Sequence, residues 1–215
     1  MVDHRRGRDT GVSVEKGRGA DRTGSPNGSV PERLLSAATR LFAERGYEST
    51  SVQEVVSAAG VTKGAMYHYF GSKDDLLYEI YARVLRMQTE HLREIASRDE
   101  PVADLVHAAA VDVIVTSVDN LDDSTIFFRS MHQLPPEKQR GVRAERREYH
   151  ELFRAMIERG RAEGVFRDDV PADLVVDYFF GSVHHLSTWY RHDGPLTGRD
   201  VGRHFADLLL AGLRP

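Results

Sequence analysis

The chain has 215 residues, of which 40% are hydrophobic, and its 29 Lys and Arg against 33 Asp and Glu give a formal net charge of −4. This apolar content can bury a core, which excludes a wholly disordered chain, and the lack of cysteine excludes disulfides and thiolate metal sites. Charged residues interrupt every apolar run before the roughly 20 residues that a membrane span needs, and no apolar signal-peptide segment begins the chain. We therefore expect a cytoplasmic protein that does not contact membranes.

Residues 1–28 are rich in Gly, Arg, Asp and Ser and contain few apolar side chains. Such a composition buries too little apolar surface to order the chain, so we expect a flexible tail. Basic residues outnumber acidic ones in this tail. Two interpretations stay open: a solvated extension, or an arm that reaches the phosphates or the minor groove of DNA.

Residues 29–75 carry the signals of a helix-turn-helix domain. Helices are expected to begin where a Ser or Thr side chain can accept a hydrogen bond from the free N–H groups of a first turn. Ser29 with Glu32 has the spacing of a capping box, and Gly46 suits the end of that helix. Gly60 then allows a tight turn between the second and third helices. The later helix starts are expected at Thr50 (paired with Gln53), Thr62 and Ser72.

The third of these helices has the side-chain chemistry of a DNA-reading helix. Met66 and Phe70, four residues apart, are expected to form its inward stripe, which leaves polar and aromatic groups outward. Gly64 and Ala65 add little bulk, so this face can approach base edges closely. Lys73 follows at the first position of the fourth helix, where the helix macrodipole disfavours a cation unless an anion such as phosphate is also bound. The alternative is an exposed lysine that the two following aspartates screen.

The remainder, residues 76–215, is expected to form a helical ligand-binding and dimerisation domain. Apolar residues recur at helical spacing, proline and glycine separate the segments, and no alternating strand pattern is found. The predicted fold class is therefore all-α, with about nine helices. After the long fourth helix, the expected helices cover residues 102–118, 124–133, 137–163, 172–190 and 200–213.

The stretch TSVQEVVSAAGVTKGAMYHYFGSK, from Thr50 to Lys73, resembles the DNA-binding signature of the TetR family of bacterial transcriptional regulators. The resemblance implies a homodimer that binds a palindromic operator in double-stranded DNA and represses transcription until a small hydrophobic effector enters the second domain. By position, it implies phosphate contacts for Thr50 and Ser51, base contacts for Thr62, Lys63, Gly64, Ala65 and His68, and backbone contacts for Tyr67, Tyr69 and Lys73.

The run TWYR at residues 188–191 is similar to the C-terminal region of family members that sense acyl-CoA thioesters, including mycobacterial regulators of sterol-ring catabolism. This likeness implies an acyl-CoA effector; another hydrophobic effector is the alternative. An acyl-CoA requires an apolar tunnel with cations near its mouth. Core packing alone would also explain each aromatic candidate. The candidates are Phe127, Phe180 and Trp189 for the tunnel, and Arg129 and Arg191 for the cations.

The last two expected helices each have an apolar face that suits the four-helix interface of a homodimer. These faces contain Leu174, Tyr178, Gly181, Leu186 and Tyr190 in one helix, and Phe205, Leu208, Leu209 and Leu213 in the other.

Other classes of function have less support. His184 and His185 are adjacent in a helix and diverge by about 100°, so we expect no metal site. No nucleophile elbow, phosphate-binding glycine loop or His-Glu metal motif is found, so we expect neither an enzyme nor a cofactor. An architectural DNA-binding protein without an effector stays open, as does, with less support, an all-helical enzyme.

Overall fold

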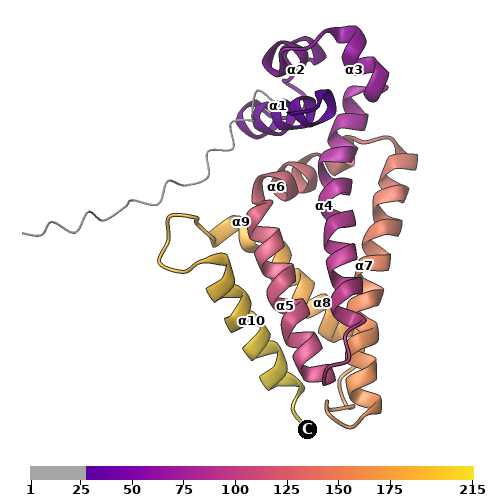
Figure 1. Ribbon diagram of the computed structural model, residues 1–215, viewed down its shortest axis with the longest axis vertical. Helices are drawn as coiled ribbons and strands as arrows, with labels where there is room; N and C mark the ends of the chain where they lie inside the picture. Colours follow the sequence, from indigo (N-terminus) through magenta and orange to yellow (C-terminus); the bar gives the residue numbers. More distant parts are fainter. Residues whose placement is uncertain (1–27) are drawn as a thin grey trace, which may run out of the picture.

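The computed structural model describes residues 28–215, so the expected tail at residues 1–28 lies almost wholly outside the described part. Every regular element within this part is a helix, which confirms the all-α class. Figure 1 shows a small head at one end of the molecule and a longer body of helices that extends away from it. One helix, α4, belongs to both.

The head consists of α1 (Val30–Arg45), α2 (Val52–Ala59) and α3 (Lys63–Tyr69). Ser29 and Glu32 form the predicted capping box. Gly60 ends α2 with φ 63°, a left-handed conformation that favours glycine.

The turn after α2 is fixed by a side chain of α1. The Arg33 guanidinium donates hydrogen bonds to the carbonyl oxygens of Ala59 at 2.7 Å and Gly60 at 2.6 Å. This contact satisfies carbonyl groups that the end of α2 leaves without helical partners.

Helix α4 (Lys73–Ala96) runs without a break from the head into the body (Figure 1). Its start is capped as predicted, because the Ser72 side chain accepts a hydrogen bond from the Asp75 N–H. Its buried line, which includes Leu77, Ile80 and Leu85, packs on both head and body helices.

The body is arranged around α5, against which α4, α7 and α10 pack. Helix α5 is apolar around most of its circumference, as a helix covered on several sides must be. It lies close to α10 at Gly202, where a Cβ would be only 3.1 Å from the Val111 carbonyl oxygen. The body elements are α5 (Val102–Asp119), α6 (Leu121–Ser130), the 3-10 turn η1 (Met131–Gln133), α7 (Pro136–Ala162), α8 (Ala172–His184), α9 (Leu186–Trp189) and α10 (Gly198–Leu213).

Two expected spans differ from the structure. The single helix expected over residues 172–190 is interrupted at His185, so that α8 and the short α9 are separate. The helix expected over residues 124–133 begins earlier, at Leu121, and its last three residues form the 3-10 turn. In the part of the chain that the structure describes, no helix combines the length and apolarity needed to cross a membrane.

Replacing Gly160 with alanine is expected to destabilise the body by about 1–3 kcal/mol, because side-chain volume would be forced into a filled core. A Cβ at Gly160 would lie 2.1 Å from the buried ring of Phe166. Gly141→Ala in the same helix is the control, since a Cβ there meets only ordinary contacts with Tyr78 from 3.5 Å. The control should keep or gain stability through helix propensity. Equal midpoints in urea for the two variants would contradict the prediction.

Candidate DNA-binding head and ligand cavity

The outward face of α3 presents the polar and aromatic residues that the sequence indicated. Met66 is fully buried and Phe70 is 8% exposed, so these two anchor α3 as predicted. Tyr67 and Tyr69 are 47% and 51% exposed, values far above those of core aromatics. The other residues of this face, Lys63, Gly64 and His68, are exposed, and Ala65 is half-buried.

The start of α2 corrects the prediction for Thr50. Its side chain is 1% exposed, and its hydroxyl donates a hydrogen bond to the Gly46 carbonyl oxygen at 2.9 Å. The cap of α2 is Ser51, paired with Glu54, one residue later than expected. A buried hydroxyl cannot reach a phosphate, so of the two residues only the exposed Ser51 is left for that contact.

Lys73 and Thr62 both take part in contacts within the head. The Lys73 ammonium donates hydrogen bonds to the carbonyl oxygens of Tyr47 at 2.9 Å and Thr50 at 3.1 Å, and lies 4.2 Å from the centroid of the Tyr47 ring. Thr62 is exposed and caps α3, accepting from the Ala65 N–H at 3.1 Å. The expected phosphate contact of Lys73 stays a prediction, and because an ammonium has three N–H donors, it does not require either carbonyl partner to be given up.

Replacing Lys73 with alanine is expected to lower the free energy of unfolding by about 1.5 kcal/mol, because two charge-assisted hydrogen bonds that close the head are lost. Operator affinity should fall as well, since the α1–α2 turn loses its attachment to α4. Titrations at several salt concentrations separate the two roles of the residue. A salt slope smaller by about 1 assigns a phosphate contact to Lys73, and an unchanged slope assigns the whole effect to the head. Unchanged stability would contradict the prediction.

Polar contacts connect the head and α4 to the body. Asp123 of α6 is 2% exposed, and its Oδ1 accepts from the Thr39 hydroxyl of α1 at 3.1 Å and from the Arg83 guanidinium of α4 at 2.9 Å. Lys138 of α7 forms an ion pair with Asp75 at the start of α4. These contacts join α6 directly to α1 and α4, and α7 to the start of α4.

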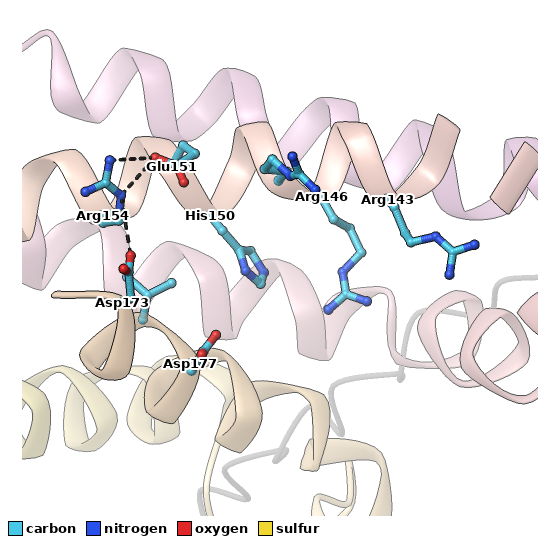
Figure 2. A pocket seen from close by; sticks show the side chains of 9 residues that line it. Arg143, Arg146, His150, Glu151, Arg154, Asp173 and Asp177 are labelled. Atoms are coloured by element: carbon cyan, nitrogen blue, oxygen red, sulfur yellow. Dashed lines mark hydrogen bonds and ion pairs between the residues drawn. The ribbon is translucent and has the colours of Figure 1, made fainter. Parts of the chain in front are cut away.

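A cavity of about 430 Å³ lies between α7 and α8. Figure 2 shows Arg143, Arg146 and His150 extending from α7 to one side, with Asp173 and Asp177 on α8 opposite that helix. The full lining is Arg143, Arg146, Arg147, His150, Glu151 and Arg154 from α7, and Asp173, Val176 and Asp177 from α8.

Aromatic rings lie next to His150, which lines this cavity, and next to His184, whose ring is 6.2 Å from that of His150. The His150 ring stacks on Phe180 with centroids 4.1 Å apart, and the His184 ring lies 5.0 Å from Phe128. Arg146 has a nitrogen 3.3 Å from His184 Nε2. Burial, followed by the charge of Arg146, lowers the pKa of His150 to about 4 and that of His184 to about 3. Both imidazoles are therefore neutral at pH 7.

The five residues predicted to bind an effector differ widely in their exposure to solvent. Phe127 is fully buried, with its ring stacked on Tyr81 at 3.8 Å between centroids. Phe180 is 2% exposed and lies behind His150 rather than at a surface, and Trp189 is 47% exposed. None of the five predicted residues lines the α7/α8 cavity, the neighbouring cavity on α7 from Arg140 to Glu151, or the cavity beside α5 and α10. Arg129 and Arg191 are exposed on α6 and after α9.

The cations beside the α7/α8 cavity come from a part of the sequence for which no ligand contact was predicted. Five arginines occur between residues 140 and 154, in the run RGVRAERREYHELFR. Their spacing of three and four residues was the signal available, because it places charges on one helical face. Among the described residues, no group of three or more His, Cys, Asp or Glu side chains could hold a metal ion.

The expected dimer faces divide into an exposed and a buried set. Leu174 and Tyr178 of α8 are 59% and 70% exposed, and Leu208 of α10 is 72% exposed. Gly181 is exposed and Phe205 is half-buried. The remaining candidates, Leu186, Tyr190, Leu209 and Leu213, are buried inside the protomer and are corrected to core residues.

Two family models match this chain. The model described as bacterial regulatory proteins, tetR family, matches residues 34–80, which include the helix-turn-helix. The model described as tetracyclin repressor-like, C-terminal domain, matches residues 99–213, more than half of the chain. The chain belongs to the TetR family of transcriptional regulators. It is thus a DNA-binding regulator, and the family resemblance drawn from residues 50–73 is confirmed.

Individual TetR-family proteins align over most of the chain. The HTH-type transcriptional repressor KstR2 of Rhodococcus jostii is 28% identical over 200 residues, which are 90% of this chain and 95% of the relative. The structure of PfmR from Thermus thermophilus has a TM-score of 0.77 and 31% identity, and the match covers 85% of this chain and 100% of that chain. AibR, solved in complex with isovaleryl coenzyme A and operator DNA, has a TM-score of 0.71 and 23% identity, covering 87% and 99%; this likeness is one of fold.

Proposed function

We propose that this protein is a homodimeric repressor that binds a palindromic operator through α3 and leaves it when a CoA thioester binds to the body. The observation that carries the DNA-binding part is the division of α3 into a buried anchor, Met66, and an exposed polar face. A helix held in this way can enter a major groove without disturbing its own packing. The proposed DNA contacts are Ser51, Thr62, Lys63, Gly64, Ala65, Tyr67, His68, Tyr69 and Lys73.

The homodimer is supported by the exposed apolar side chains of α8 and α10. Leu174, Tyr178 and Leu208 are each more than half exposed. Large apolar residues gathered on neighbouring surfaces mark protein–protein interfaces. A two-fold axis would bring α8 and α10 of both protomers together as four helices, and would place two copies of α3 on the half-sites of a palindrome.

The CoA thioester is supported by two observations. AibR was solved with isovaleryl coenzyme A together with operator DNA. In this chain, the α7/α8 cavity is lined by four arginines, and guanidinium groups are well suited to phosphates. Release requires only that the effector bind a conformation with wrongly spaced heads more tightly than the operator-bound one.

The side chain of Lys63 is expected to set base specificity, because it is exposed at the first position of the DNA-reading helix. Lys63→Ala should change the preferred base at one position of each half-site and cost about 10-fold in affinity for the wild-type operator. Deleting residues 1–27 should lower affinity without changing the consensus. Selection from a random DNA pool, followed by mobility-shift titration, measures both effects. Selection of no palindrome by the intact protein would contradict the proposed function.

A further inference from the structure

The α7/α8 cavity contains more positive charge than its own carboxylates neutralise. Arg154 has partners, since its Nη2 lies 2.8 Å from Glu151 and its Nε lies 3.7 Å from Asp173. The other three arginines of the lining have no carboxylate oxygen within 4.0 Å in the part of the chain that the structure describes. This arginine cluster consists of Arg143, Arg146 and Arg147.

The cluster lies on one side of α7. Its members are three, one and four residues apart, so that Arg143 is a helical neighbour of both Arg146 and Arg147. Figure 2 shows Arg143 and Arg146 extending to the same side of the helix. Cations held this close repel one another, and an anion placed among them converts that repulsion into attraction.

A second hollow extends the same basic surface around α7. This cavity of about 510 Å³ shares Arg143 and Arg147 with the first, and adds Arg140. The two cavities therefore adjoin on α7, and their shared lining consists of Arg143, Arg147 and Glu151.

The lining of the first cavity also includes His150 and the apolar Val176. The Arg146 guanidinium lies 5.4 Å from the centroid of the Phe128 ring, and His150 stacks on Phe180. Neutral imidazoles and aromatic rings suit an apolar group, whereas the arginine cluster suits a polyanion. The cavity thus combines the arginine cluster with a smaller, less polar part at His150 and Val176.

We propose that the arginine cluster binds the phosphate groups of a phosphate-bearing effector, with the apolar part of that molecule directed toward His150 and Val176 of the same cavity. The inference deepens the proposed function and rests on it for the identity of the effector as a CoA thioester. The place of the cluster in the fold also suits regulation, because α7 is paired with α4 through Lys138 and Asp75, and α8 carries the exposed Tyr178.

The experiment compares Arg143→Gln/Arg147→Gln and Arg146→Gln with the wild-type protein by calorimetry. The probes are isovaleryl coenzyme A, ring-bearing acyl-CoAs, free coenzyme A, adenosine 3′,5′-bisphosphate and the free acids. Each lost guanidinium should lower affinity for the phosphate-bearing probes about 10-fold or more, and the loss should shrink as salt is raised. Arg159→Gln, on the same helix but outside both cavities, is the control and should bind every probe like the wild type. Operator affinity without effector should be unchanged in all variants, which shows that they fold.

The possible results distinguish between two hypotheses: that the arginine cluster binds phosphate, and that the effector is a CoA thioester. If the cluster variants bind acyl-CoAs with the same affinity as the wild-type protein, the arginine cluster is not the phosphate site. The proposed effector class, a CoA thioester, is then still supported. Binding of adenosine 3′,5′-bisphosphate that depends on the cluster, without binding of any thioester, supports the phosphate site and overturns the CoA thioester. Binding of the free acids alone, or of no probe, overturns both.

Discussion

The double variant Tyr178→Glu/Leu208→Glu is expected to be monomeric and to lose specific operator binding by about 10³-fold or more. Tyr178 is 70% exposed and Leu208 72% exposed in the protomer, so neither substitution disturbs the core. In a two-fold interface each glutamate occurs twice, and an unpaired carboxylate costs several kcal/mol when it is buried. A monomer reads only one half-site, and its affinity falls toward that for unrelated DNA.

Sedimentation velocity and mobility-shift titration measure the two parts of this prediction. Val165→Glu is the matched control, because Val165 is 41% exposed and lies in the connection between α7 and α8 rather than on α8 or α10. The control should remain dimeric and bind the operator normally. A double variant that sediments as a dimer would show that the protomers associate through another surface.

Replacing Phe127 with alanine is expected to lower the free energy of unfolding by about 3–5 kcal/mol. Its side chain is fully buried and stacks on Tyr81 with an interplanar angle of 13°, so its removal leaves a cavity between α6 and α4. The loss is large because surrounding helices relax only partly into such a space.

The matched control is the next residue, Phe128→Ala, since that ring is 39% exposed. Denaturation in urea should give a clearly smaller loss for Phe128 than for Phe127. The pair also tests the prediction that Phe127 lines an effector tunnel. Small destabilisation by Phe127→Ala together with loss of effector binding would restore Phe127 to the ligand site and contradict its assignment to the core.

The head was predictable because its determinants are local. A capping box joins residues three apart, and Gly60 ends α2 through its own backbone angles. The signals also give a boundary only to within a residue or so, because Thr50 and Ser51 are both acceptable caps. The preceding turn decides between them, because the Thr50 hydroxyl is bonded to the Gly46 carbonyl four residues earlier and is turned inward.

The ligand cavity was not predictable in the same way. Apolar spacing marks aromatic residues as inward, but it does not tell a cavity wall from a packed core, and Phe127 proved to be core. The link between the head and the body joins Thr39 to Asp123, which are 84 residues apart in the chain. Neither residue has a neighbour in the sequence that would indicate such a contact. The arginines could be recognised in the sequence by their spacing, but nothing in the sequence indicated that α8 lies opposite them.

Helix α4 connects the body to the head as one continuous helix. Its 24 residues contain no glycine or proline, so it has no built-in kink, and at 1.5 Å per residue it is about 36 Å long. A tilt of about 5° at the body end therefore moves the head end by about 3 Å. In the proposed homodimer the two heads would move in opposite senses, and the distance between them would change by up to about 6 Å, against the roughly 34 Å between successive major grooves. In the proposed repressor, a shift that is slight at α7 thus becomes, at the DNA, a mismatch of up to about two base-pair steps of 3.4 Å.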